Sequence, residues 1–244
     1  MLVDKLRRLL GIIIISFPVL FLQSELAGAT AISHYPLQIK YPNTMIYKAE
    51  TNEKVIAFTF DDAPDEIYTP QILDVLKKHD VKATFFLLGA RVKKYPHIVK
   101  RIYNEGHIIG NHTYWHPELT KTGVANMVWE INENEKAIKS VLGFNTNLFR
   151  APYGALNEEM VRKLKEMGYQ GIGWSIDSED WKGITKGEIK ANILEHVHPG
   201  SIVLMHAAGN VSGTPDALEE LITYLKKNGY YFVTVEDLWK LNFK

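Results

Sequence analysis

Short apolar segments alternate with amphipathic segments about seven times after residue 54 of this 244-residue chain. The apolar segments are rich in β-branched and aromatic residues and predict strands near Val55–Phe60, Ala83–Leu88, His107–Gly110, Asn147–Arg150, Gly171–Ser175, Ser201–Met205 and Tyr231–Val233. The amphipathic segments predict helices near Thr69–His79, His97–Glu105, Val124–Leu142, Asn157–Met167, Thr185–His196 and Pro215–Asn228. Such alternation is typical of parallel βα units and favours an α/β barrel of about seven strands in a single domain.

The first 31 residues predict a targeting segment that is not part of the fold. Three basic residues before position 9 precede an apolar run over 9–22, and small residues at 27–31 offer cleavage sites. The run is short for a membrane-spanning helix, so a signal peptide is preferred, and an uncleaved N-terminal membrane anchor stays open. Residues 32–52 are expected to form a lead-in, in which Pro36 and Pro42 discourage regular structure, and the folded domain is expected over 53–244. The protein is therefore expected to be exported, either secreted or associated with the cell envelope.

Charge and cysteine content exclude several classes of function. The formal net charge is zero and the pI is about 7.1, without the basic excess typical of nucleic-acid-binding proteins. No nucleic-acid partner is expected. The chain also contains no cysteine, which excludes disulfides, thiol catalysis and a thiolate zinc site. Any metal ion must be held by His, Asp or Glu.

Polar side chains stand just past the ends of the predicted strands. They are Asp61, Asp62, His112, His116, Arg150, Asp180 and His206. Each of them, taken alone, also fits a solvated turn, a capping histidine or an ion pair in a loop. However, the C-terminal ends of parallel strands converge on one face of an α/β fold, where functional sites are built. One shared site explains all seven positions together.

Two pairs among these residues indicate a metal ion. Asp61 and Asp62 are adjacent at the mouth of a buried strand, and their carboxylates repel each other unless a charge such as a divalent cation offsets them. His112 and His116 are four residues apart. On one face of a helical turn, their imidazoles could share one metal ion.

Five short motifs in this chain resemble those of the polysaccharide deacetylase family, the NodB homology domain or carbohydrate esterase family 4. They stand in the family's order over about 53–241, as Thr59–Pro64, His112–His116, Arg150–Gly154, Asp177–Trp181 and Leu204–His206. Ala63 departs from the pattern, because the family usually has glycine there. Its methyl group could narrow the loop or shift Asp62 if the position needs a positive φ.

The resemblance implies a distorted (β/α)7 barrel with a single catalytic domain, which removes acetyl groups from sugar chains with the help of a metal ion. Asp62, His112 and His116 would hold that metal, with a water on it as the nucleophile. Asp61 would be the general base, tethered by Arg150. Zinc is the first choice because three nitrogen and oxygen ligands leave a position open for water, while cobalt or nickel would also suit these ligands.

The resemblance assigns the remaining motif residues to the leaving group and the substrate. His206 would be the general acid, paired with Asp180. Trp181 and Leu204 would line the acetyl pocket, and the backbone N–H of Tyr153 would help to bind the oxyanion.

Three functions stay open. The leading prediction is a deacetylase that acts on N-acetylglucosamine (GlcNAc) residues of peptidoglycan or a chitin-like polymer. The nearest alternative is an O-acetyl esterase on xylan-type polymers, which the same residues could serve. A catalytically inactive carbohydrate-binding module is disfavoured because Asp61 and His206 are intact. The expected partner is the polysaccharide substrate. The protein is expected to be a monomer, with membrane contact only through an uncleaved N-terminal segment.

Overall fold

The computed structural model describes residues 35–241, all within the unit Ser33–Lys244. The predicted targeting segment, residues 1–31, lies outside the described residues. Between residues 35 and 241, no helix is both long and apolar enough to cross a membrane.

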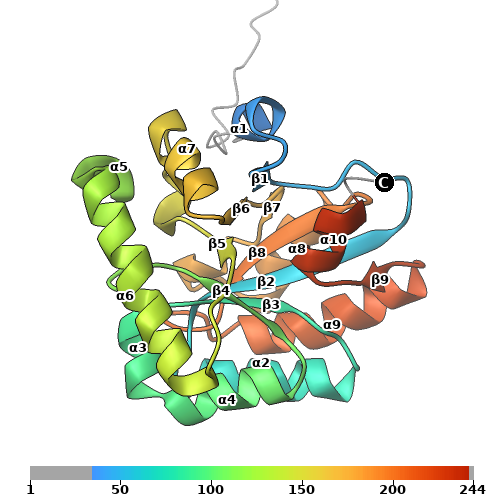
Figure 1. Cartoon of the computed structure of the whole chain (residues 1–244). Coiled ribbons are helices and arrows are strands. Elements are labelled where there is room, and N and C mark those ends of the chain that lie inside the picture. The colour runs from blue at the N-terminus through green and yellow to red at the C-terminus, as the bar shows by residue number, and fades with distance from the viewer. Residues whose placement is uncertain (1–34, 242–244) are drawn as a thin grey trace, which may run out of the picture. The chain divides into compact units, whose positions relative to one another are not determined.

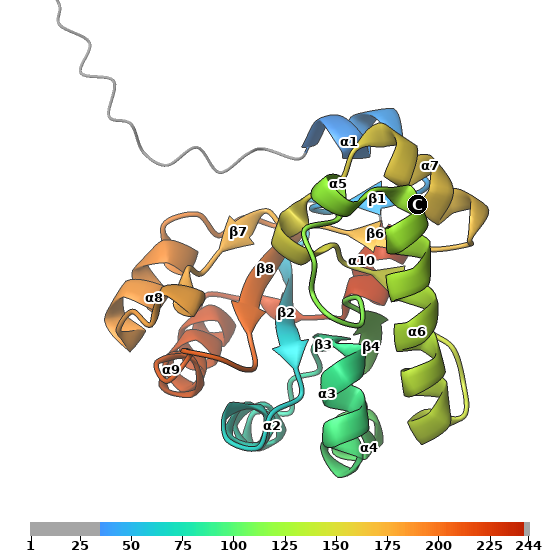
Figure 2. The same cartoon turned by 90° about the vertical axis from the view of Figure 1, so that its left-hand side faces the viewer.

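The strands of the described chain form one strongly curved, nine-stranded sheet (Figures 1 and 2). In chain order they are β1 Met45–Ile46, β2 Val55–Ala63, β3 Thr84–Leu87, β4 Ile108–Asn111, β5 Leu148–Phe149, β6 Gln170–Ile172, β7 Ile176–Asp177, β8 Ser201–His206 and β9 Tyr231–Phe232. Their spatial order is β1-β6-β5-β4-β3-β2-β8-β7, with β9 beside the start of β2. All pairings between these strands are parallel. This architecture confirms the predicted distorted (β/α)7 barrel.

Helices follow most strands and cover the outer side of the curled sheet, as Figure 2 shows for α2, α4, α6, α8 and α9. The helices are α1 Tyr35–Lys40, α2 Tyr68–Lys78, α3 Gly89–Lys94, α4 Pro96–Asn104, α5 Leu119–Thr122, α6 Val124–Leu142, α7 Glu158–Glu166, α8 Lys186–Leu194, α9 Thr214–Lys227 and α10 Val235–Leu241. The six predicted helices and seven predicted strands are all present, with ends shifted by at most three residues.

Alternation along β2 decides which side chains face the interior of the barrel. Phe58 and Phe60 are fully buried and pack outward against the helices, where each contributes roughly 1.5–3 kcal/mol of stability. Ala57 belongs instead to a separate apolar cluster inside the barrel. Because successive side chains of a strand point to opposite faces, Thr59 and Asp61 follow Ala57 inward. The strand therefore places the carboxylate of Asp61 in the interior of the barrel, at the C-terminal end of β2.

The expectation that residues 32–52 lack regular structure is wrong. Pro36 lies in the first turn of α1, where its missing N–H would have no helical partner in any case. Pro42 lies just beyond the helix, a position in which proline is common. Strand β1 then pairs with β6, Met45 opposite Gly171. The lead-in thus adds an edge strand to the sheet.

Candidate active site

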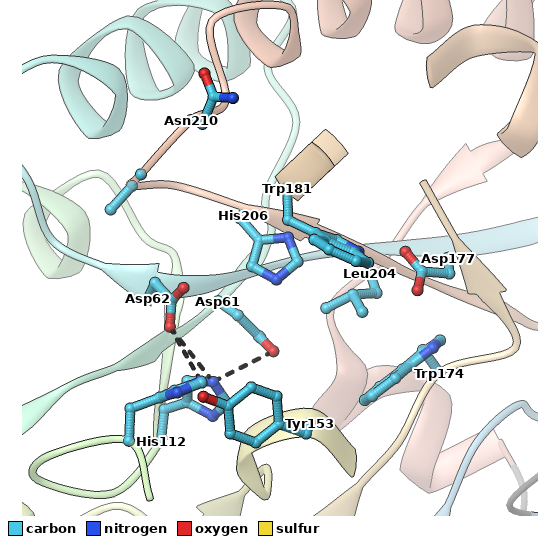
Figure 3. A pocket seen from close by; sticks show the side chains of 13 residues that line it. Asp61, Asp62, His112, Tyr153, Trp174, Asp177, Trp181, Leu204, His206 and Asn210 are labelled. Carbon is cyan, nitrogen blue, oxygen red and sulfur yellow. Dashed lines mark ion pairs between the residues drawn. The ribbon is translucent and has the colours of Figure 1, made fainter. Parts of the chain in front are cut away.

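The C-terminal ends of the strands surround a cavity of about 440 Å³ (Figure 3). Its walls are formed by Asp61, Asp62, His112, His116, Tyr153, Trp174, Asp177, Trp181, Leu204, His206, Ala208, Gly209 and Asn210. Eight of the ten predicted site residues are among them. The other two, Arg150 and Asp180, are buried behind the wall, where they hydrogen-bond Asp61 and His206.

Asp61 and Asp62 both line this cavity, although adjacent residues of a regular strand point to opposite faces. The cause is a local break in β2. Its register against β3 is irregular between Phe60 and Ala63, and Asp62 has a φ of 65°. A left-handed conformation costs a residue other than glycine roughly 1–2 kcal/mol. Such strain persists where the surrounding structure imposes it, and this occurs most often at functional sites.

Asp62, His112 and His116 place one carboxylate oxygen and two imidazole nitrogens within 4.8 Å of one another. The Nε2 atoms of His116 and His112 lie 3.5 and 3.7 Å from Oδ1 of Asp62. Among the described residues, nothing donates a hydrogen bond to this buried oxygen. Because a buried polar atom needs a partner, the donor set fits a divalent cation held by one carboxylate and two imidazoles.

The tautomer of His112 also suits metal binding. Its Nδ1 lies 2.8 Å from the backbone oxygen of Arg150, so the ring donates its Nδ1 proton there and keeps the Nε2 lone pair for a cation. Metal-binding histidines are commonly oriented by such a hydrogen bond from the other ring nitrogen.

The expectation of a helical turn from His112 to His116 is wrong. Thr113 and His116 have φ values of 71° and 65°, and the segment is a loop. The physical reason is that the backbone N–H groups of residues 113–116 donate to side chains instead of to helical carbonyls. The two imidazoles nevertheless meet, with ring centroids 5.0 Å apart.

Arg150 holds Asp61 from behind the cavity wall. Its fully buried guanidinium donates to Asp61 Oδ1 at 2.8 Å and Thr59 Oγ1 at 2.7 Å. It also donates to the backbone oxygens of Ile172 and Gly173. Burial raises the pKa of Asp61, but the positive charges of Arg150 and the nearby histidines outweigh that effect and hold the pKa below its ordinary value. Asp61 is therefore ionised near neutral pH.

His206 forms a buried pair with Asp180 on the opposite side of the cavity. The His206 Nδ1 and backbone N–H lie 2.7 and 2.9 Å from the two carboxylate oxygens. Burial lowers the pKa of His206, but the hydrogen bond and charge of Asp180 outweigh it and raise the pKa to about 9. Thr214 at the start of α9 donates to Asp180 Oδ2 at 2.7 Å.

The substrate-facing wall contains the other predicted residues. Leu204 is buried on β8, while Tyr153 and Trp181 are more than half exposed at the rim. Sequence reasoning gave no site role to five further members of this wall, which are Trp174, Asp177, Ala208, Gly209 and Asn210. Trp174 had a usable signal, since it lies near the C-terminal end of the predicted strand Gly171–Ser175, whereas Asn210 lies in a loop with none.

These features define a class of protein: an enzyme with a parallel-stranded α/β fold and a candidate Asp-His-His metal centre. An ionised carboxylate and a protonated imidazole on the cavity wall can accept a proton and donate one at a single reacting group.

Comparison with known proteins agrees with this class. Residues 48–172 match the family described as polysaccharide deacetylase. A peptidoglycan-N-acetylglucosamine deacetylase of Bacillus cereus is 43% identical over 191 residues, which cover 78% of this chain and 70% of that protein. The chain belongs to the polysaccharide deacetylase family, and it is a hydrolase of the polysaccharide N-deacetylase class.

Two further relatives differ in the sugar that their names give. The peptidoglycan-N-acetylmuramic acid deacetylase PdaA of Bacillus subtilis is 40% identical over 196 residues, which cover 79% of this chain and 74% of that protein. The solved structure of the Bc1960 peptidoglycan N-acetylglucosamine deacetylase has a TM-score of 0.80 and 39% identity. That match covers 84% of this chain and 96% of the other. These relatives are named for peptidoglycan, and their names differ in which of its two sugars is deacetylated.

Proposed function

We propose that this protein removes N-acetyl groups from GlcNAc residues of peptidoglycan with the help of a divalent metal ion, zinc being the first candidate. The observation that carries the proposal is the meeting of Asp62, His112 and His116 in a cavity also lined by Asp61 and His206. When bound, the cation would polarise the acetamide carbonyl and acidify a water molecule beside it. Such a substrate would also require a location outside the cytoplasm, as expected for an exported protein.

Asp61 is the proposed general base. It is ionised because Arg150 and the histidines favour its charged form, and its Oδ2 lies on the cavity side, 3.5 Å from His112 Nε2. From there it can accept the proton of the attacking water. Arg150 is a positioning residue, since it holds the other carboxylate oxygen.

His206 is the proposed general acid. An amine leaves an acetamide only when it receives a proton. The hydrogen bond to Asp180 keeps Nδ1 engaged and leaves Nε2 to donate. The acetyl methyl group would lie against Leu204 and Trp181, while the N–H of Tyr153 would donate to the oxyanion.

The charge of the cavity supports GlcNAc over N-acetylmuramic acid. Among residues 35–241, no lysine or arginine lines the cavity, and Asp177 adds a third carboxylate on the side of Leu204 (Figure 3). N-acetylmuramic acid carries a lactyl group on the ring carbon next to the acetamide, with a free carboxylate once the peptide is removed. That carboxylate would enter a cavity that lacks lysine and arginine among these residues and whose protonated side chain, His206, is already paired with Asp180. The second candidate, muramic acid deacetylation, rests on the Bacillus subtilis relative.

Acetate release from defined polymers tests the proposal. The substrates are chitotetraose, peptide-free glycan strands of peptidoglycan and acetylxylan, with a His116→Ala variant as the background control. After acid hydrolysis and amino-sugar analysis, we expect newly exposed amines on glucosamine. New amines confined to muramic acid would reverse the sugar assignment, and acetate from acetylxylan alone would identify an O-acetyl esterase.

Asp180→Asn should move the alkaline limb of the pH–rate profile to lower pH. The acid works only while His206 is protonated, and the hydrogen bond and charge of Asp180 are the largest of the effects that raise its pKa. Asparagine keeps the size of the side chain but removes the charge, so His206 loses its proton at lower pH. The check is the initial rate of acetate release from chitotetraose across neutral and alkaline pH. An unmoved alkaline limb would show that another group sets it.

Ala63→Gly should leave activity unchanged and lower the free energy of unfolding by about 1 kcal/mol. Ala63 is fully buried and has no positive φ; Asp62 has the left-handed conformation instead. Glycine would therefore remove a buried methyl group and add freedom to the unfolded chain without relieving strain. Urea unfolding and acetate release measure both effects. A large gain in activity would indicate that the methyl group distorts the position of Asp62.

A further inference from the structure

The loop between the two candidate histidine ligands is held by a buried carboxylate that no part of the proposed chemistry uses. Glu130 of α6 is 3% exposed. Its Oε2 accepts two hydrogen bonds of 2.8 Å each, from the backbone N–H groups of Tyr114 and Trp115. These are two of the three residues between His112 and the second histidine.

We infer that Glu130 is a positioning residue that fixes the geometry of His112 and His116 and thereby sets the metal affinity of the site. The inference rests on the proposed metal-dependent function. Glu130 would act from outside the ligand set, through the backbone that joins the two ligands.

The hydrogen bonds on either side of Glu130 show why the carboxylate matters to the loop. The Thr113 N–H donates to Asn111 Oδ1 at 2.9 Å, and the His116 N–H donates to Thr113 Oγ1 at 3.0 Å. All four backbone N–H groups of residues 113–116 thus donate to side chains, and among these acceptors only Glu130 accepts hydrogen bonds from two of them. It is also the only acceptor of the three with an acidic side chain, and hydrogen bonds to a charged acceptor are about twice as strong as neutral ones.

The burial of Glu130 is informative in its own right. Within residues 35–241, no lysine, arginine or histidine forms an ion pair with it. A buried charge without a counter-ion is unfavourable unless its hydrogen bonds compensate. Here the compensating bonds go to the loop that carries the ligands.

The loop needs such a restraint because its backbone is held away from its preferred conformations. Thr113 and His116 both lie in the left-handed region, which residues other than glycine leave when they are free to do so. Without Glu130, the segment would relax to other backbone conformations, and the Nε2 atoms of His112 and His116 would no longer point to the same metal position. Metal affinity depends on such preorganisation, and partners outside the ligand set commonly change it 10–100-fold.

A direct test measures zinc binding to the metal-free protein by competition with a chromophoric chelator. For Glu130→Ala we expect affinity to fall about 10–100-fold. For Glu130→Gln, which keeps an oxygen acceptor but loses the charge, we expect a smaller fall. The matched control is Glu133→Ala on the same helix, whose side chain forms an ion pair with Lys136 at the surface. This control should bind zinc like the wild type.

Two further measurements separate positioning from simple stabilisation. In Glu130→Gln, amide hydrogen exchange of Tyr114 and Trp115 should accelerate without metal, while exchange in the barrel strands stays unchanged. The absorption spectrum of the cobalt-substituted variant should differ from that of the wild type, since it reports ligand geometry. Unchanged zinc affinity in both Glu130 variants, alongside a wild type that binds zinc, would overturn the inference. A wild type that binds no zinc, cobalt or nickel would overturn the proposed metal dependence itself.

Discussion

Replacing His116 with alanine should remove the metal ion and abolish deacetylation in a single step. The candidate centre has three protein donors, and the loss of one leaves a carboxylate and a single imidazole. Those two donors cannot retain the cation against chelators, and without it neither the carbonyl nor the attacking water is activated. Elemental analysis of the purified variant should find far less than one metal ion per chain.

The matched control for this prediction is His97→Ala. His97 is exposed on α4, outside the cavity, so its loss should leave metal content and turnover unchanged. Full metal occupancy in His116→Ala would show that the ion is held by a different set of residues.

Replacing His206 with alanine should lower deacetylation of GlcNAc oligomers by about 10²–10⁴, which is the usual contribution of a positioned general acid. The hydrolysis of 4-nitrophenyl acetate should fall far less in the same preparation. The difference arises because an amine needs a proton in order to leave, whereas nitrophenolate is stable as an anion near neutral pH. The informative quantity is the ratio of the two losses.

Metal content should be measured in the same His206→Ala protein, because His206 lies in the same cavity as the candidate ligands. Equal losses on both substrates would mean that His206 shapes the site and that the leaving group obtains its proton elsewhere.

The sequence predicted elements well where a local pattern decides the structure. Helix α6 was predicted over its observed range, Val124–Leu142, because its apolar residues recur with helical period and glycines flank both ends. Strand β1 was missed because two residues show no alternation, and they become a strand only by pairing with β6, far along the chain. Contacts made by tertiary packing leave no such local signal.

The candidate site shows the same division. Motif positions were enough to name residues that meet around one cavity, although the roles given to them stay predictions. Motifs could not show that the side chain of Asp62 faces the same cavity as that of Asp61, because this depends on a break in the register of β2. Glu130 was also hidden, since a glutamate in an amphipathic helix ordinarily faces water and only the folded loop gives it buried donors.

The burial of Arg150 has a consequence for how a lineage with this fold could lose its activity. Substitutions that remove the charge of Asp61 would leave a guanidinium buried without its counter-ion, and breaking such a pair typically costs about 3–5 kcal/mol. That is a large part of the 5–15 kcal/mol that commonly separates folded from unfolded protein. Mutations at the exposed rim residue Tyr153 carry no comparable penalty. Relatives that have lost catalysis should therefore keep the Asp–Arg pair after the residues at the rim have changed. The presence of this pair in a relative reflects its contribution to stability as much as its role in catalysis.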